Sequence, residues 1–132
     1  MIGIVIVAHG GLAQEYLAAM KHVVGPQRGV RAVSTKSTDD RDLKENEICN
    51  AANEVDTGDG VIIVADMFGA SPSNLSLAAC KLAKRRILYG MNLPMLIKLA
   101  KSRHLDVSDA VSRATEAGRK YIDSQNVSSD TA

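Results

Sequence analysis

The chain has 132 residues, of which 45% are hydrophobic and 23% are charged, a composition typical of one soluble globular domain. Its 16 Lys and Arg residues nearly balance its 15 Asp and Glu residues, and aromatic residues make up only 3%. Such a chain lacks both the positive charge and the stacking rings of a nucleic-acid-binding protein.

The N-terminus and the cysteines indicate a cytoplasmic protein. The apolar run at residues 2–8 lacks the basic residues that precede a signal peptide, and no apolar run approaches the roughly 20 residues of a membrane-spanning helix. Cys49 and Cys80 do not have CxxC spacing, so we expect two buried thiols in a reducing compartment. We therefore predict no insertion in a membrane.

The first half of the chain alternates between strand and helix patterns. Residues 2–8 form a continuous apolar run typical of a strand buried on both faces. Apolar residues at helical spacing follow and end at Gly25-Pro26, and a weaker strand is predicted over residues 30–35. Polar residues 37–40 offer N-caps to a helix with Leu43, Ile48, Ala51, Ala52 and Val55 facing inward.

The second half continues the alternation. Residues 61–65 predict a second strongly buried strand, which ends at Asp66, and residues 87–90 predict a fourth strand. Ser71 and Pro72 predict the start of a helix, a short helix is expected from 93 to about 103, and the last helix begins near Asp106. The apolar stripe of the first of these helices consists of Leu75, Ala78, Ala79, Leu82 and Ala83. That of the last helix consists of Val107, Ala110, Val111, Ala114, Ala117, Gly118, Tyr121 and Ile122.

The order βαβαβαβαα predicts a single α/β domain over residues 1–122, with a mainly parallel open sheet covered by helices on both faces. Residues 123–132 are polar and are expected to form a flexible tail.

Two residues at predicted strand ends suggest a catalytic pair. His9 follows the first strand and Asp66 follows the third, and these strands are neighbours in a 2-1-3-4 order. Sites in open α/β sheets form beyond the carboxyl ends of the strands, where the strand order reverses. A carboxylate that holds one imidazole N–H leaves the other ring nitrogen as a nucleophile.

The residues before the third helix suggest a phosphate-binding loop. Gly69 allows close approach of a phosphate, Ser71 and Ser73 add hydroxyl donors, and N–H groups at a helix start bind anions. Gly10 offers a similar turn after the first strand. Each feature alone is commonly structural, a helix cap or a hydrogen-bonded histidine, but the combination predicts a phosphohistidine site.

Other sites of phosphate chemistry fit less well. Receiver domains need an acidic pair after the first strand to hold Mg²⁺, where this chain has Ala8-His9. A Walker lysine loop and the features of a flavin site are also missing. His22 and His104 are expected to be ordinary surface residues, and three scattered histidines give no metal-ligand spacing, so we expect no metal or cofactor.

Three segments together resemble the enzyme IIA domain of the mannose family of the bacterial phosphoenolpyruvate:sugar phosphotransferase system. They are residues 4–10 (IVIVAHG), 64–74 (VADMFGASPSN) and 90–96 (GMNLPML), and their spacing extends the resemblance to about Ile122. The resemblance implies that His9 accepts a phosphoryl group from phospho-HPr and passes it to a IIB domain or protein. Asp66 then orients His9, and the loop of Gly69, Ala70, Ser71 and Ser73 lies near the phosphate.

The resemblance also implies a homodimer in which a further antiparallel strand is contributed across the subunits. Two alternatives stay open at this point. The domain could be regulatory, reporting phosphoenolpyruvate supply through its phosphorylation state without transport. It could also be the related phosphotransfer subunit of dihydroxyacetone kinase, although residues 68–74 favour the sugar system.

Overall fold

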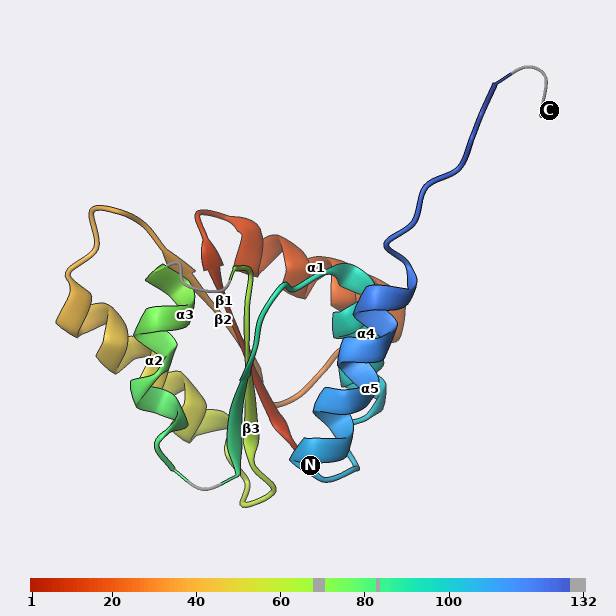
Figure 1. Ribbon diagram of the computed structural model, residues 1–132. Helices are drawn as coiled ribbons and strands as arrows, with labels where there is room; N and C mark the ends of the chain where they lie inside the picture. The colour runs from red at the N-terminus through yellow and green to blue at the C-terminus, as the bar shows by residue number, and fades with distance from the viewer. Residues whose placement is uncertain (68–70, 83, 129–132) are drawn as a thin grey trace.

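A computed structural model describes residues 1–67, 71–82 and 84–128 (Figure 1). The four strands form one parallel sheet in the order β2-β1-β3-β4, as the sequence predicted. In chain order the elements are β1 (Gly3–His9), α1 (Leu12–Val24), β2 (Val30–Thr35), α2 (Arg41–Val55), β3 (Val61–Ala65), α3 (Ser71–Ser76), the short 3₁₀ helix η1 (Ala78–Cys80), β4 (Arg85–Leu88), α4 (Leu93–Lys101) and α5 (Val107–Lys120).

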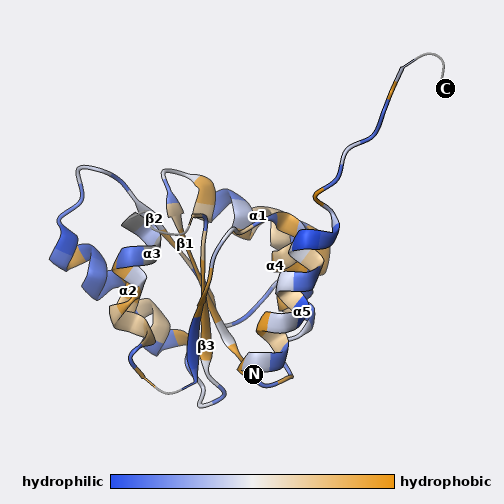
Figure 2. Ribbon diagram, in the orientation of Figure 1, coloured by the Kyte–Doolittle hydropathy of each residue, from blue (hydrophilic) through white to orange (hydrophobic). Residues whose placement is uncertain are grey.

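Helices cover both faces of the sheet, which explains why its central strands are apolar throughout. Ile4 and Ile6 of β1 pack in a core with α1, α4 and α5, whereas Val5 and Val7 pack in a second core with α2 and α3. Successive side chains of a strand point to opposite faces, so a strand between two helical layers must be apolar at every position. Figure 2 shows β1 and β3 as hydrophobic along their length.

Side-chain caps fix the starts of three helices. Asp40 accepts a hydrogen bond from the Leu43 N–H at the start of α2, and Asp106 accepts one from the Asp109 N–H at the start of α5. Asn92 caps α4 by accepting from the Met95 N–H. Each cap satisfies a backbone donor that has no partner within its helix.

Several predicted helical positions were wrong. Leu43 is 69% exposed, because it lies in the first turn of α2, before the helix reaches the sheet. Ser71 is the first residue of α3 rather than its cap, and the helix gives way after Ser76 to η1, so Leu82 is 57% exposed. The predicted inward position Ala83 lies outside the described residues.

The end of the last helix was also predicted too late. Since α5 ends at Lys120, Tyr121 and Ile122 are exposed rather than packed. Residues 122–128 are exposed and lie in neither a helix nor a strand, and Figure 1 shows them leading away from the domain.

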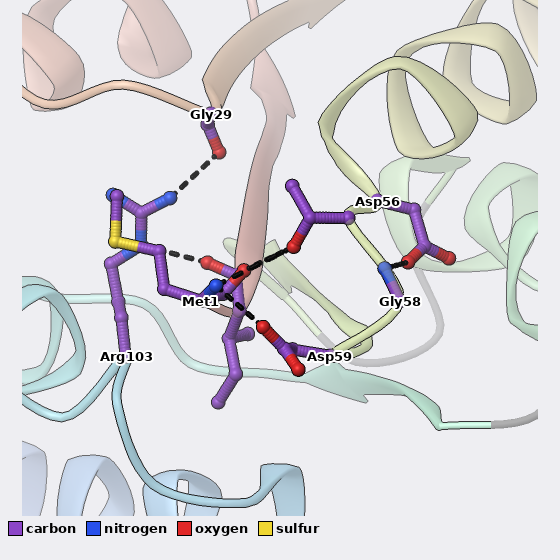
Figure 3. A network of polar contacts seen from close by, with 8 residues as sticks. Met1, Gly29, Asp56, Gly58, Asp59 and Arg103 are labelled. Carbon is purple, nitrogen blue, oxygen red and sulfur yellow. Dashed lines mark hydrogen bonds and ion pairs between the residues drawn. The ribbon is translucent and has the colours of Figure 1, made fainter.

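A network of polar contacts joins chain segments at the amino edge of the sheet (Figure 3). The Arg103 side chain, between α4 and α5, is buried and donates to the carbonyls of Ile2 (2.7 Å) and Gly29 (3.2 Å) and to Gln27 (3.2 Å). Nearby, the Met1 amino group lies 2.6 Å from Asp59 Oδ2. These contacts tie the start of β1 to the loops before β2 and β3.

Within the described ranges, none of the helices is both long enough and apolar enough to cross a membrane.

Candidate functional site

His9 and Asp66 meet at the carboxyl edge of the sheet. His9 is the last residue of β1, and Asp66 directly follows β3, the parallel neighbour of β1. The His9 Nδ1 atom lies 2.8 Å from Asp66 Oδ2, and the His9 backbone N–H donates to the same oxygen at 3.0 Å. An ionised carboxylate only accepts hydrogen bonds, so this contact requires the ring proton on Nδ1.

The pair is held on one side and open on the other. The Asp66 side chain is only 14% exposed, whereas half of the His9 side chain is exposed. No described residue forms a hydrogen bond with His9 Nε2, so this nitrogen can carry a lone pair toward an incoming group. The arrangement can act as a nucleophile with a fixed tautomer.

Thr35 supports the backbone around His9, a role that the sequence analysis missed. This buried residue ends β2 and pairs with His9 in the parallel register. Its hydroxyl donates to the Ala8 carbonyl at 3.3 Å, and its carbonyl accepts from the Gly10 N–H at 2.9 Å. Only a weak signal was available, because a 2-1-3-4 order makes the first two strands neighbours but does not fix which of their residues pair.

Gly10 has a positive φ of 54°, and an added Cβ would meet nothing within 4 Å. Because L-residues with side chains rarely adopt this conformation, glycine is favoured where the chain turns from β1 into α1. The turn keeps the backbone next to His9 free of side chains.

The predicted phosphate loop is only partly described. Gly69 and Ala70 lie outside the described residues, and so do the side chains of Ser71 and Ser73. The backbone of α3 begins at Ser71, and α3 contacts both β1 and β3. The Ser76 hydroxyl, one turn further on, donates to the Pro72 carbonyl at 2.6 Å within the helix.

The remaining histidines are exposed, and the two cysteines are half-buried rather than fully buried as predicted. His22, on α1, and His104, between α4 and α5, are exposed. Burial raises the pKa of the Cys80 thiol to about 11, and burial also raises the pKa of Cys49, so both thiols stay protonated at neutral pH. A hollow of about 640 Å³ lies at the opposite edge, beside Arg103 and Lys84, and does not include His9.

The chain is similar to proteins of known family. The family described as the PTS (phosphotransferase) system fructose IIA component, EIIA-man, matches residues 3–116. YadI of Escherichia coli (strain K12), named as a candidate phosphotransferase enzyme IIA component, is 30% identical over 126 residues, 94% of this chain and 86% of that protein. The mannose-specific EIIAB component of the same organism is 28% identical over 127 residues, 92% of this chain but 38% of that protein.

Solved structures share the fold. The mannose/sorbose specific IIA subunit from Enterococcus faecalis has a TM-score of 0.85 at 23% identity, and the match covers 96% of each chain. Component EIIA from Streptococcus agalactiae has a TM-score of 0.79 at 25% identity, with 94% of this chain and 97% of that chain covered. The likeness therefore includes the sheet and the helices on both of its faces.

Proposed function

The chain belongs to the EIIA-man family of phosphotransferase-system IIA components, and from this premise we propose that His9 is the residue that carries the phosphoryl group. The family gives the chain a phosphotransfer role in sugar uptake. The single observation that supports His9 is its Nδ1 contact with Asp66 at 2.8 Å, on a side chain that is otherwise half exposed.

In the proposed reaction, the Nε2 lone pair of His9 attacks the phosphorus of a phosphohistidine on HPr. The N–P bond to the HPr ring breaks as the new N–P bond forms, and the HPr nitrogen keeps the electron pair. Since Nδ1 of His9 retains its proton, the phosphorylated ring becomes positively charged. The Asp66 carboxylate, 2.8 Å away, neutralises that charge. A second transfer of the same kind passes the phosphoryl group to a IIB component.

The loop before α3 belongs to the same proposal. In the sequence, Gly69 and Ala70 precede α3, and Ser71 and Ser73 belong to its first turn. The helix contacts the strand that carries His9. In the proposal these residues bind the oxygens of the phosphoryl group, together with the backbone at Gly10.

The proposal extends to location and assembly. Residues 1–122 form the phosphotransfer domain, residues 123–132 form a tail, and the domain works in the cytoplasm as a homodimer. Leu12 and Met67, which are 47% and 60% exposed, follow the two strand ends of the site within three residues. Exposed apolar side chains so close to His9 suit the docking of a partner protein.

The direct test is phosphorylation with phosphoenolpyruvate, enzyme I and HPr, followed by intact mass and peptide mapping. We expect one phosphoryl group, on His9, with the acid lability and base stability of an N–P bond. His22→Ala and His104→Ala are matched controls, because both histidines are exposed, and they should be labelled like the wild type. Persistence of the label in His9→Ala would contradict the assignment.

A further inference from the structure

The helices α4 and α5 form a groove with basic residues along both walls. Arg113, Glu116, Ala117 and Lys120 lie three, four and seven residues apart, and so share one side of α5. They line a hollow of about 230 Å³ together with Lys98 of α4 and Tyr121. A second hollow of about 250 Å³ shares Lys98, Ala117 and Tyr121 with the first, so the two are halves of one groove.

Positive charge predominates in the first hollow, where the Lys120 ammonium also lies 5.6 Å from the centroid of the Tyr121 ring. Three cations and one carboxylate line it, which gives a net charge of about +2 at neutral pH. Among the described residues, Lys98, Arg113 and Lys120 form no ion pair, even though Glu116 lies three residues from Arg113 and four from Lys120. The single carboxylate leaves an excess of positive charge, so the hollow attracts an anion.

Helix dipoles account for only part of this pattern. Lys98 and Lys120 lie in the last turns of their helices, where the negative end of the dipole favours cations. Arg113 lies in the middle of α5, where no such preference exists. Arg113 is therefore the cation that the helix dipoles do not explain, and with the two lysines it makes three cations around one hollow.

Contacts on the far side of α5 hold the groove in place. The Asn92 side chain donates to the Gly118 carbonyl at 3.0 Å, so the start of α4 lies beside the end of α5. At Gly118 an added Cβ would lie only 3.1 Å from the Met95 side chain, which shows how closely the helices approach. The opposed ends of the two helices offset each other's dipoles, and the side-chain cations dominate the local charge.

We propose that this groove binds a small phosphomonoester, with its phosphate between Lys98, Arg113 and Lys120. A phosphomonoester carries about −1.5 to −2 charges at neutral pH, which matches the charge of the hollow. Arg and Lys are also the side chains that bind phosphate most strongly, Arg through its paired donors.

The second half of the groove has the chemistry to hold the organic part of such a ligand. Pro94, Ile97 and Tyr121 line it together with Lys101. Apolar surface next to a cationic pocket favours an ester over free phosphate. The site shares no residue with His9 and Asp66, and its test does not depend on the role proposed for them.

The test is calorimetric titration of the full chain, at constant ionic strength, with inorganic phosphate, glucose 6-phosphate and glucose. We expect saturable binding of both phosphate compounds, with a Kd of about 1 mM or tighter for the ester, and no binding of glucose. Equal affinity for the two phosphate compounds would assign the hollow to free phosphate and remove the organic half of the proposal. Amide shifts in a ¹⁵N NMR titration should centre on Ala117 and Tyr121.

Matched variants distinguish binding in the groove from a general effect of the net positive charge of α5. Arg113→Gln and Lys120→Gln should each weaken glucose 6-phosphate binding about tenfold or more, because each removes a charge-assisted hydrogen bond. Arg119 lies on the same helix but lines neither half of the groove. Arg119→Gln removes the same charge and should therefore change the affinity by less than about twofold. Binding should persist in His9→Ala. The absence of saturable binding, or equal weakening in Arg119→Gln, would overturn the proposal.

Discussion

One carboxylate oxygen holds both the ring and the backbone of the candidate histidine. Asp66 Oδ2 accepts from His9 Nδ1 and from the His9 backbone N–H. The backbone donor cannot change its role, whereas an imidazole can change its tautomer. The oxygen is therefore fixed at this position by the backbone, and it selects the tautomer with the proton on Nδ1.

This geometry makes a specific prediction for Asp66→Asn. An amide nitrogen at the Oδ2 position would face the His9 N–H, donor against donor, so the amide oxygen should stay there and keep the tautomer. What the variant loses is the negative charge beside the phosphorylated ring. We expect phosphoryl transfer from phospho-HPr to slow by roughly ten- to a thousandfold, well short of complete loss.

Rapid-quench transfer kinetics measure that rate, and ¹⁵N NMR of the His9 ring reports the tautomer, with circular dichroism as the folding control. A folded Asp66→Asn protein that transfers at the wild-type rate would show that Asp66 has no part in the reaction. A His9 ring with its proton on Nε2 instead of Nδ1 would show that the His9 backbone N–H does not fix the orientation of the new side-chain amide.

Two serines in the first turn of α3 are the subject of a second prediction. Ser71→Ala and Ser73→Ala should each slow transfer modestly, because each removes a hydroxyl donor from the proposed phosphate-binding segment. The fold should survive, because alanine is at least as favourable as serine within a helix. Gly69→Val should slow transfer more, since a branched side chain would crowd the phosphate. Ser108→Ala, at the exposed first turn of α5, is the control. Wild-type rates in all three loop variants would remove the loop from the mechanism.

The pairing of His9 with Asp66 could be predicted because each residue directly ends or follows an unmistakably buried strand. Only the strand order was needed to place them together. Thr35 was harder to find, because the weaker β2 pattern gave no reason to examine its last residue. Asp66 as the acceptor for the His9 backbone could not be predicted, since it depends on the turn after β3.

At the scale of elements, the strands were predicted more accurately than the helix ends. The bounds expected for β2 and β3 agree with the structure. β3 is buried at every position and β2 only in part, but a glycine with positive φ, Gly29 or Gly60, precedes each strand and marks its start. The helix of residues 71–83 was expected to be continuous, yet it changes to a 3₁₀ turn after Ser76. The spacing of apolar residues predicts which face of a helix is buried. It does not predict the last helical residue, because that depends on tertiary contacts.

Two glycines in the turn before β3 provide a matched comparison. Gly58 and Gly60 both have positive φ, 102° and 97°. A Cβ on Gly58 would meet nothing within 4 Å, but one on Gly60 would lie 2.6 Å from Val107 Cγ2 and closer still to the Lys84 carbonyl oxygen. Gly58→Ala should lower the free energy of unfolding by about 1–2 kcal/mol through backbone strain alone.

Gly60→Ala adds the steric clash to the same strain, and it should cost about 3 kcal/mol or more. Urea denaturation of the two variants measures the difference directly. Equal losses would mean that α5 and the residues before β4 shift to accommodate the new side chain. The comparison therefore tests how rigidly the amino edge of the sheet is packed.

At the scale of the whole molecule, the two edges of the sheet differ in how much of their polar side chains is exposed. The carboxyl edge holds His9, with half of its side chain exposed. The amino edge holds Arg103, whose guanidinium is buried and donates three hydrogen bonds to two chain segments, the start of β1 and the loop before β2. Burial lowers the pKa of Arg103, and no described carboxylate pairs with it, so its carbonyl and amide acceptors alone compensate for the desolvation.

This division predicts that stability and phosphoryl transfer can be changed separately. Arg103→Met keeps most of the side-chain volume but removes three hydrogen bonds, and should lower the free energy of unfolding by about 3 kcal/mol. The transfer rate per folded molecule should stay at the wild-type value, because His9 lies at the other end of β1, about 20 Å away. Arg28→Met, an exposed position in the loop before β2, is the matched control and should change neither quantity. Urea denaturation and rapid-quench kinetics on the same preparations test both parts. A slower rate in folded Arg103→Met would show that the amino edge controls the position of His9 through β1.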